Sequence, residues 1–372
     1  MPIFRKMKRW GTLCTVVALF SILFAACDTG NSPSILNTAG PVAGQEANLF
    51  WFILIVACIV FVVVEGWIIL NVVRFHARPN SPEPKQTQGN NALEIGWTIV
   101  PSVFLFLVLA VTIRTMFGLA QPPGNHVTVR AVGHQWWWEF DYPNDGNVTT
   151  ADSLYVPVNT VVQIDLVSTN VIHSFWIPQL TGKTDDIPGH NNTMWFKANT
   201  TGIYRGECAE YCGTQHAHMD FDVVVLSPAD YATWLSQQQQ AASSSASGMA
   251  AQGLALFKGA GGCSGCHGIV GVDLPSYTSS TAANFIGPNL THFASRHLIA
   301  GGILSTTNIH QYNWANDPAC QIVNGQVASP STCGLYQWLL NPQAIKPGSD
   351  MVIGHLTPQQ ITELIAYLQT LQ

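Results

Sequence analysis

Charged residues are scarce in this chain of 372 residues, since Asp, Glu, Lys and Arg together make up only 10% of it. Hydrophobic residues reach 47%, which is too apolar for an ordinary soluble enzyme and indicates membrane-spanning segments. Basic residues are the scarcer charge, with 15 Lys and Arg against 21 Asp and Glu. Nucleic-acid binding depends on clustered Lys and Arg, so nucleic acid is excluded as a sensible partner. The excess of acidic residues favours a basic soluble protein as a binding partner instead.

Residues 1–27 have the build of a secretory leader, with a basic start, an apolar run and small residues before a cysteine. The sequence FAAC, which ends at Cys27, resembles the cleavage box of bacterial lipoproteins and predicts lipidation of that cysteine. Ordinary cleavage and an uncleaved anchor are the alternatives. In each case the next segment begins outside the cell membrane.

Two apolar runs predict a transmembrane hairpin over residues 45–118, with spans at about 50–73 and 95–116. Basic residues between the runs predict a cytoplasmic connection, so that everything after the hairpin is external. Glu65 lies inside the first span, where a carboxylate is costly unless it faces protein or water. Glu94 precedes the second span, where a helix start favours a carboxylate.

Three further regions follow the hairpin. Alternating runs rich in β-branched residues, broken by Pro, Asn and Gly, predict a small antiparallel β-sandwich over residues 119–235. Residues 236–249 are polar and of low complexity, which predicts a flexible linker. Residues 250–372 form a separate domain that opens and closes with helical patterns, the last of which starts at Thr357.

The densest group of metal-binding side chains lies in residues 207–219, which read ECAEYCGTQHAHM. Thiolate, imidazole and thioether groups are the donors that copper prefers. The candidate set is His173, Cys208, Glu210, Cys212, His216 and Met219. A buried cysteine pair or a disulfide is the plain alternative.

Two thiolates four residues apart can each bridge two metal ions, with one histidine for each copper. Met219 and the backbone carbonyl of Glu210 would be weak outer ligands. An electron shared over two coppers changes each bond only slightly, which suits rapid electron transfer and not bond-making chemistry.

A second motif, CSGCH at Cys263, Cys266 and His267, is the attachment pattern of c-type haem. The thiols would form thioethers to the porphyrin, His267 would be an axial iron ligand, and Met351 is the candidate for the other axial position. A thioredoxin-like redox pair or half of a zinc site is the alternative. The histidines that compete with Met351 are His292, His297, His310 and His355.

Cys320 and Cys333 lie thirteen residues apart in an insertion rich in Gly, Ser and Pro. In an oxidising compartment this pair predicts a disulfide.

The copper-loop sequence, together with GHQWWWEFDYP, HSFWIP, KTDDIPGH and EIGWTIVP, resembles subunit II of the haem–copper cytochrome c oxidases. The CSGCH region, with GPNLTHFASR and WLLNPQAIKPGSDM, resembles the cytochrome c domain that is fused to this subunit in the caa3-type enzymes. The resemblance implies a two-helix transmembrane hairpin, then an all-β cupredoxin-like Greek-key sandwich, then an all-α class I cytochrome c domain. Two departures are the WWW run and Val352, which stands where proline usually follows the methionine ligand.

The resemblance also implies roles for single residues. The copper-loop set matches the ligands of the binuclear copper centre CuA, and the side chain of Glu210 matches a ligand of magnesium at the subunit I boundary. Trp136 matches the aromatic residue through which electrons enter, with a place in the sandwich core as its alternative. Glu94 matches the carboxylate at the mouth of a proton path into subunit I, whereas Glu65 matches no role in the family.

The implied function is to pass electrons from a soluble cytochrome c or small copper protein, through covalent haem c, to CuA. The haems of subunit I then reduce oxygen to water with proton pumping, and this chain holds no oxygen-reducing site. The implied partners are subunits I and III in a bacterial cell membrane, where this chain is multi-pass with its copper and haem domains on the outer face. Alternatives are a CuA subunit of a nitric oxide reductase complex, a membrane-bound copper-delivery protein and a structural quinol oxidase subunit.

Overall fold

The computed structural model describes residues 33–76, 83, 86, 88–242, 246–276 and 285–372. The expected leader and its Cys27 lie outside the described residues. Residues from Ile35 to Gln372 form one compact unit.

Helices α2 (Pro41–Arg74) and α3 (Asn91–Leu119) are long and apolar enough to cross a membrane. They contain the predicted spans and extend them at both ends. At the start of α3 the Asn90 side chain accepts hydrogen bonds from two backbone N–H groups, which explains why the helix begins before the apolar run. No side chain in the central window of either helix is buried within the structure, as expected of a surface that lipid covers. Glu65 is one of the exposed side chains of α2.

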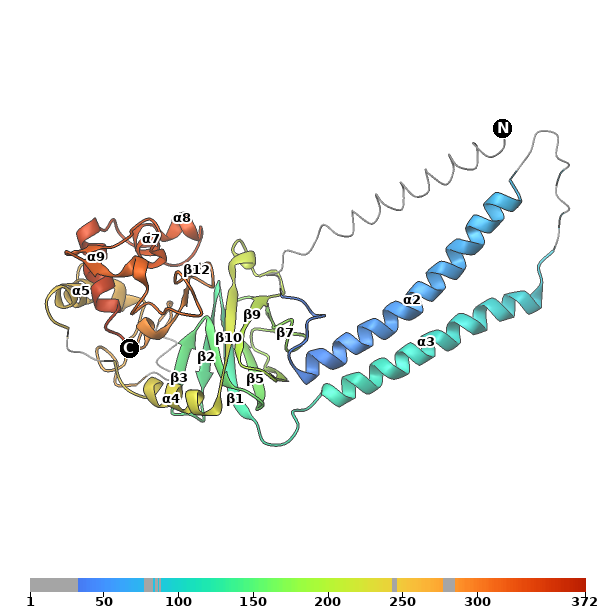
Figure 1. Ribbon diagram of the computed structural model, residues 1–372, viewed down its shortest axis with the longest axis horizontal. Helices are drawn as coiled ribbons and strands as arrows, with labels where there is room; N and C mark the ends of the chain where they lie inside the picture. Colours follow the sequence, from blue (N-terminus) through green and yellow to red (C-terminus); the bar gives the residue numbers. More distant parts are fainter. Residues whose placement is uncertain (1–32, 77–82, 84–85, 87, 243–245, 277–284) are drawn as a thin grey trace. The chain divides into compact units, whose positions relative to one another are not determined.

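The middle of the chain forms a β-sandwich of two five-stranded sheets (Figure 1). The first sheet, in spatial order, contains β3 (Val148–Ala151), β2 (Trp137–Tyr142), β1 (Val127–His134), β5 (Val161–Ser168) and β8 (Asn192–Lys197). The second contains β4 (Ser153–Pro157), β10 (Asp220–Leu226), β9 (Gly202–Cys208), β6 (His173–Trp176) and β7 (Lys183–Asp186). This arrangement confirms a cupredoxin-like sandwich after the two apolar helices.

The sandwich is mixed, so the prediction of a wholly antiparallel one is wrong. Strand β1 pairs in parallel with β5, and β4 pairs in parallel with β10. In each parallel pair the chain passes through other strands before it returns in the same direction, and such crossovers leave no local sequence signal.

Aromatic side chains fill the space between the sheets. Trp138, Phe175 and Phe221 are fully buried, and the Trp138 ring meets the other two edge-on, with centroids 5.4 and 5.6 Å away. Offset and edge-on packing of this kind adds to the hydrophobic stabilisation of a core. Phe175 lies in β6 and Phe221 in β10, the two strands that pair with β9, so the core lies against the strands that hold the copper loop (residues 207–219).

The C-terminal region contains α-helices, 3-10 turns and two short hairpins. Among its described residues the α-helices are α5 (Met249–Lys258), α7 (Gly334–Leu340), α8 (Pro342–Ile345) and α9 (Pro358–Leu368). Its 3-10 turns are η2 (Cys263–Gly265), η3 (Phe293–Ser295) and η4 (Pro318–Cys320). The capping box of Thr357 and Gln360 starts α9, as predicted.

The expectation of an all-α C-terminal domain is wrong in one respect, because two two-stranded sheets occur there. One pairs β11 (Leu298–Ile299) with β12 (Leu304–Ser305), and the other pairs β13 (Ile322–Val323) with β14 (Gln326–Val327). Asn324 and Gly325 both have positive φ between β13 and β14, which is the backbone that an Asn-Gly hairpin turn requires. A disulfide joins Cys320 and Cys333 on either side of this hairpin.

Helix α4 (Pro228–Gln238) extends into residues 236–249, where we expect a linker. At the end of the helix and just after it, the carbonyl oxygens of Gln238 and Gln240 lie 3.1 and 2.9 Å from Nε2 of buried His292. The first part of the expected linker is therefore held against the C-terminal region.

Candidate metal centre

The structure brings the predicted copper donors together at one end of the sandwich. His173 starts β6, Cys208 ends β9, and Met219 directly precedes β10. The loop between β9 and β10 carries Cys212 and, in the turn η1 (His216–His218), the second histidine. Because β6 and β10 both pair with β9, rigid neighbouring strands hold both ends of the donor set.

The donor atoms form two similar halves. Sγ of Cys208 lies 3.8 Å from Nδ1 of His173 and 3.3 Å from the carbonyl oxygen of Glu210. Sγ of Cys212 lies 3.6 Å from Nδ1 of His216 and 3.8 Å from Sδ of Met219. The two sulfur atoms are 3.8 Å apart. Each half thus offers one imidazole nitrogen and one weak donor around a shared pair of sulfurs, which fits two copper ions.

Burial of the site suits electron transfer. His173, Cys208, Cys212 and Met219 are buried, His216 is half-buried, and the Glu210 side chain is exposed. A hydrogen bond shared with Cys212 lowers the pKa of the Cys208 thiol to about 3, and the same bond raises the pKa of Cys212. A metal ion binds thiolates, so metal binding would displace the thiol protons of this pair.

Asn170 orients the first histidine, and we did not identify it from the sequence. Its Oδ1 lies 3.0 Å from Nε2 of His173, which fixes the proton on Nε2 and leaves Nδ1 free to bind a metal ion. The signal in the sequence that could have identified Asn170 was its position three residues before His173.

Asp186 and Gly133 support the same histidine from two other strands. Asp186 lies opposite His173 in the β6–β7 register, and its Oδ2 accepts a hydrogen bond of 3.1 Å from the Gly133 backbone N–H. Burial raises the pKa of Asp186 to about 7, and this hydrogen bond opposes the rise. A Cβ atom at Gly133 would lie 2.6 Å from Asp186 Oδ2 and 2.7 Å from His173 Cδ2, so only glycine fits there.

Replacing Gly133 with alanine is therefore expected to displace His173 and weaken copper binding by about 10- to 100-fold, as changes behind a ligand usually do. Copper content per chain and the electron paramagnetic resonance spectrum measure the effect. Gly44→Ala is the control, because its Cβ would enter open space. Full copper content with an unchanged spectrum in Gly133→Ala would contradict the supporting role.

The three consecutive tryptophans have different surroundings. Trp138 is in the sandwich core, and Trp137 stacks on His134 with ring centroids 4.1 Å apart. Trp136 is half-buried, and its indole N–H donates a hydrogen bond of 3.0 Å to the Cys212 carbonyl. Trp136 is thus the member of the run that contacts the copper loop.

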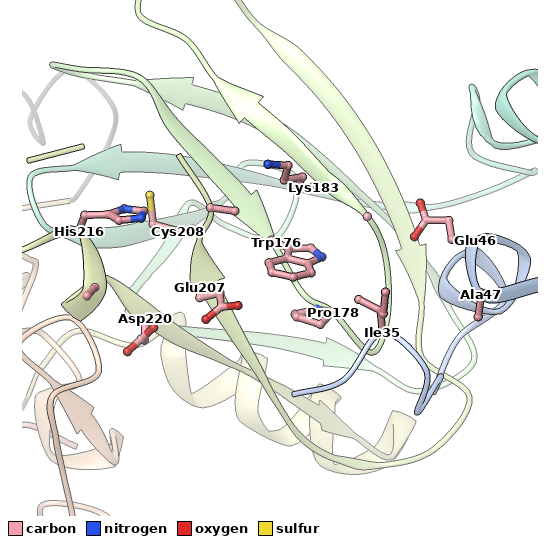
Figure 2. Close-up of a pocket in the computed structure, with 13 residues that line it drawn as sticks. Ile35, Glu46, Ala47, Trp176, Pro178, Lys183, Glu207, Cys208, His216 and Asp220 are labelled. Atoms are coloured by element: carbon pink, nitrogen blue, oxygen red, sulfur yellow. The ribbon is translucent and has the colours of Figure 1, made fainter. Parts of the chain in front are cut away.

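Two cavities meet the site. Figure 2 shows the first, with Cys208 and His216 at one end, Trp176 and Glu207 along it, and Glu46 of α2 at the other end. The second is a mainly apolar pocket in the C-terminal region, which Trp136 also lines. The copper loop therefore has one open side and one side that faces the C-terminal pocket.

The second cavity brings the residues of the haem motif together. Cys263, Cys266, His267 and Met351 all line it. The His267 Nδ1 atom lies 2.8 Å from the Pro288 carbonyl, and donation to this oxygen leaves Nε2 free to bind iron. These residues therefore fit a covalently attached haem, with the histidine and the methionine in reach of one pocket.

Comparisons with known proteins agree with the copper site. The family model described as "Cytochrome C oxidase subunit II, periplasmic domain" matches residues 146–226, and the one described as "Cytochrome C oxidase subunit II, transmembrane domain" matches residues 33–114. Cytochrome c oxidase subunit 2 of Alkalihalophilus pseudofirmus is 32% identical over 98% of this chain and 99% of its own length. The corresponding subunit of Bacillus sp. strain PS3 is 35% identical over 78% of this chain and 77% of its own length.

Among solved structures, the periplasmic domain of subunit II of cytochrome oxidase from Bradyrhizobium japonicum is 32% identical, with a TM-score of 0.31. It covers 32% of this chain and 96% of that domain. The relative from Alkalihalophilus pseudofirmus, which matches along nearly its whole length, decides the assignment. This chain belongs to the cytochrome c oxidase subunit II family and is part of an oxidoreductase complex.

Proposed function

We propose that this chain receives electrons from a soluble donor in its C-terminal region and passes them through the copper loop to subunit I. The observation that supports this most is the two-halved donor set, in which each cysteine sulfur lies within 3.8 Å of one histidine Nδ1. His173 and His216 would each hold one copper ion, Cys208 and Cys212 would bridge the two ions, and Met219 and the Glu210 carbonyl would be outer donors. When bound, the copper pair supplies one-electron transfer.

The proposal includes covalent haem c at Cys263 and Cys266, with His267 and Met351 as axial ligands. The shared cavity and the hydrogen bond that frees His267 Nε2 support this assignment. An apolar pocket and a thioether ligand both favour a high reduction potential, which suits acceptance of electrons from a mild donor. The donor would be a soluble cytochrome c or a small copper protein.

Trp136 is the proposed route from this pocket to the copper loop, since it lines the pocket and donates to Cys212. The open cavity beside Cys208 and His216 would be the outlet toward subunit I. The exposed Glu210 side chain would be available there as a magnesium ligand. Oxygen reduction to water and proton pumping belong to the complex, which would also contain subunit III.

The chain is a membrane protein with a periplasmic copper domain, as its family indicates. We place the C-terminal region on the same outer side, with both α2 and α3 in the membrane of a bacterial cell. Glu94, exposed in the first turn of α3, would serve the mouth of a proton path into subunit I. Cys27 would carry the lipid anchor.

The test uses the intact complex that contains the full chain. Mixed anaerobically with a reduced soluble cytochrome c, it is expected to show reduction of the C-terminal cofactor before the copper pair, and to turn over with oxygen. Reduction of copper first would contradict the proposed order. Turnover with nitric oxide only would indicate a nitric oxide reductase subunit, and a single copper without a mixed-valence signal would indicate a copper-delivery protein.

A further inference from the structure

Lys346 is a buried lysine whose ammonium group connects the C-terminal region to Trp136 and to the copper loop. Lys346 is only 3% exposed. Its Nζ donates to the carbonyl oxygens of Trp136 at 2.5 Å, His218 at 2.8 Å and Ala300 at 2.8 Å. Trp136 and His218 belong to the sandwich, whereas Ala300 belongs to the C-terminal region. An ammonium group has three N–H donors, so this site uses each of them once.

A second set of contacts surrounds the ammonium group. The Gly301 N–H donates to Asp152 Oδ2 at 2.9 Å, and the Gly301 carbonyl accepts from the Asp220 N–H at 2.9 Å. Gly301 has a φ of 67°, and a Cβ atom there would lie 2.3 Å from Lys346 Nζ and 2.5 Å from the Trp136 carbonyl. The backbone of the β11–β12 turn is thus pressed against the sandwich where a side chain cannot fit.

A buried polar pair also joins the sandwich to the C-terminal region at this contact. Nε2 of His297 lies 3.1 Å from Oδ2 of Asp222, and both side chains are buried. Burial lowers the pKa of Lys346 to about 8, and the carboxylates of Asp152 and Asp220 oppose this fall, so the amine stays mainly charged at neutral pH. A buried charge is retained only where its donors are satisfied, as they are here.

The contact has a consequence for Trp136. Lys346 holds its backbone carbonyl, its indole N–H is bonded to the Cys212 carbonyl, and its ring lines the pocket of Cys266 and Met351. Hydrogen bonds therefore hold Trp136 at its backbone carbonyl and at its indole N–H, between the C-terminal pocket and the copper loop. A swinging domain on a flexible tether would not need a buried lysine bonded to the sandwich.

We propose that Lys346 is a positioning residue that locks the C-terminal region onto the copper loop, so that Trp136 serves the chain's own C-terminal cofactor and not a separate donor protein. Each passage moves one electron and no atom or proton: the C-terminal cofactor is oxidised and the copper pair is reduced. The electron-transfer part of this inference rests on the proposed function, whereas the locked contact does not.

The test measures amide hydrogen exchange in the full chain, because the N–H groups of Gly301 and Asp220 both donate across the contact. In the unaltered chain they are expected to exchange as slowly as amides of the sandwich core, and rapid exchange there would overturn the lock. Lys346→Met keeps the length of the side chain and removes its three donors. It is expected to raise the exchange rate at both amides by about tenfold or more, because that factor corresponds to the free energy of one hydrogen bond to a charged group.

Lys258→Met is the matched control, because Lys258 is exposed and bonds to the Val272 carbonyl within its own region. Gly301→Ala tests the same contact from the opposite side and is expected to give the same rise. Unchanged exchange in both Lys346→Met and Gly301→Ala overturns the lock, whether or not a haem is attached.

In the loaded complex, transfer from the C-terminal cofactor to copper is expected to slow in Lys346→Met, with both absorption spectra unchanged. Raised exchange with an unchanged transfer rate would overturn the positioning role and keep the lock. A chain without covalent haem would instead contradict the proposed function, and the exchange measurement would still decide the lock.

Discussion

Replacing Cys212 with serine is expected to remove the binuclear copper centre and to reduce turnover to background. Cys212 Sγ lies within 3.8 Å of Cys208 Sγ, His216 Nδ1 and Met219 Sδ, so its loss removes a shared donor from both halves of the site. Copper affinity is expected to fall by more than roughly a hundredfold, which is the upper end of what changes behind a ligand produce. Copper per chain and the mixed-valence resonance signal measure this.

Cys58→Ser is the matched control for Cys212→Ser. Cys58 is a free, exposed cysteine of α2, so its loss is expected to leave copper content and the resonance signal unchanged. A mixed-valence signal that survives in Cys212→Ser would show that the cysteine sulfurs do not bridge two coppers.

Replacing Cys266 with serine is expected to weaken haem attachment and to leave the copper site unchanged. One thioether would be lost, and haem retention through denaturation is expected to fall sharply, since attachment would depend on Cys263 alone. The copper site would stay intact, because its donors lie in the sandwich. Turnover with a soluble donor is expected to fall to background, while a small chemical reductant still reduces the copper pair.

Ser264→Ala is the control, because it changes a residue between the two cysteines and keeps both thiols and His267. The measurements are the haem stain of the denatured chain, the copper spectrum and the oxygen consumption rate. Full turnover in Cys266→Ser together with loss of the haem stain would show that electrons reach the copper without a covalently attached haem.

Several elements could be predicted from local pattern alone. The apolar runs predicted both ends of α3 and the end of α2 within a few residues, because a membrane span is a property of composition and length, whereas α2 starts nine residues before the predicted span. The spacing of Cys208, Cys212 and Met219 predicted the donor loop, since the loop is short and both its ends enter neighbouring strands. Thr357 predicted the start of α9 through its capping box.

Other features depended on strand order and could not be read from local pattern. The two parallel strand pairs come from crossovers between the sheets, while each strand taken alone has the same alternation as an antiparallel one. The short hairpin between Cys320 and Cys333 follows from its Asn-Gly turn, a signal that the expectation of an all-helical domain obscured.

The sequence by itself determined which donors are present, where the membrane spans lie and which cysteines precede a histidine at haem spacing. Only the tertiary structure decided what supports those donors. Gly133 and Asp186 are 53 residues apart, and Lys346 and Trp136 are 210 apart, yet each pair is in direct contact. Such contacts depend on strand register and on how one region packs against another, because they join a side chain to a distant backbone atom and impose no periodicity on the sequence.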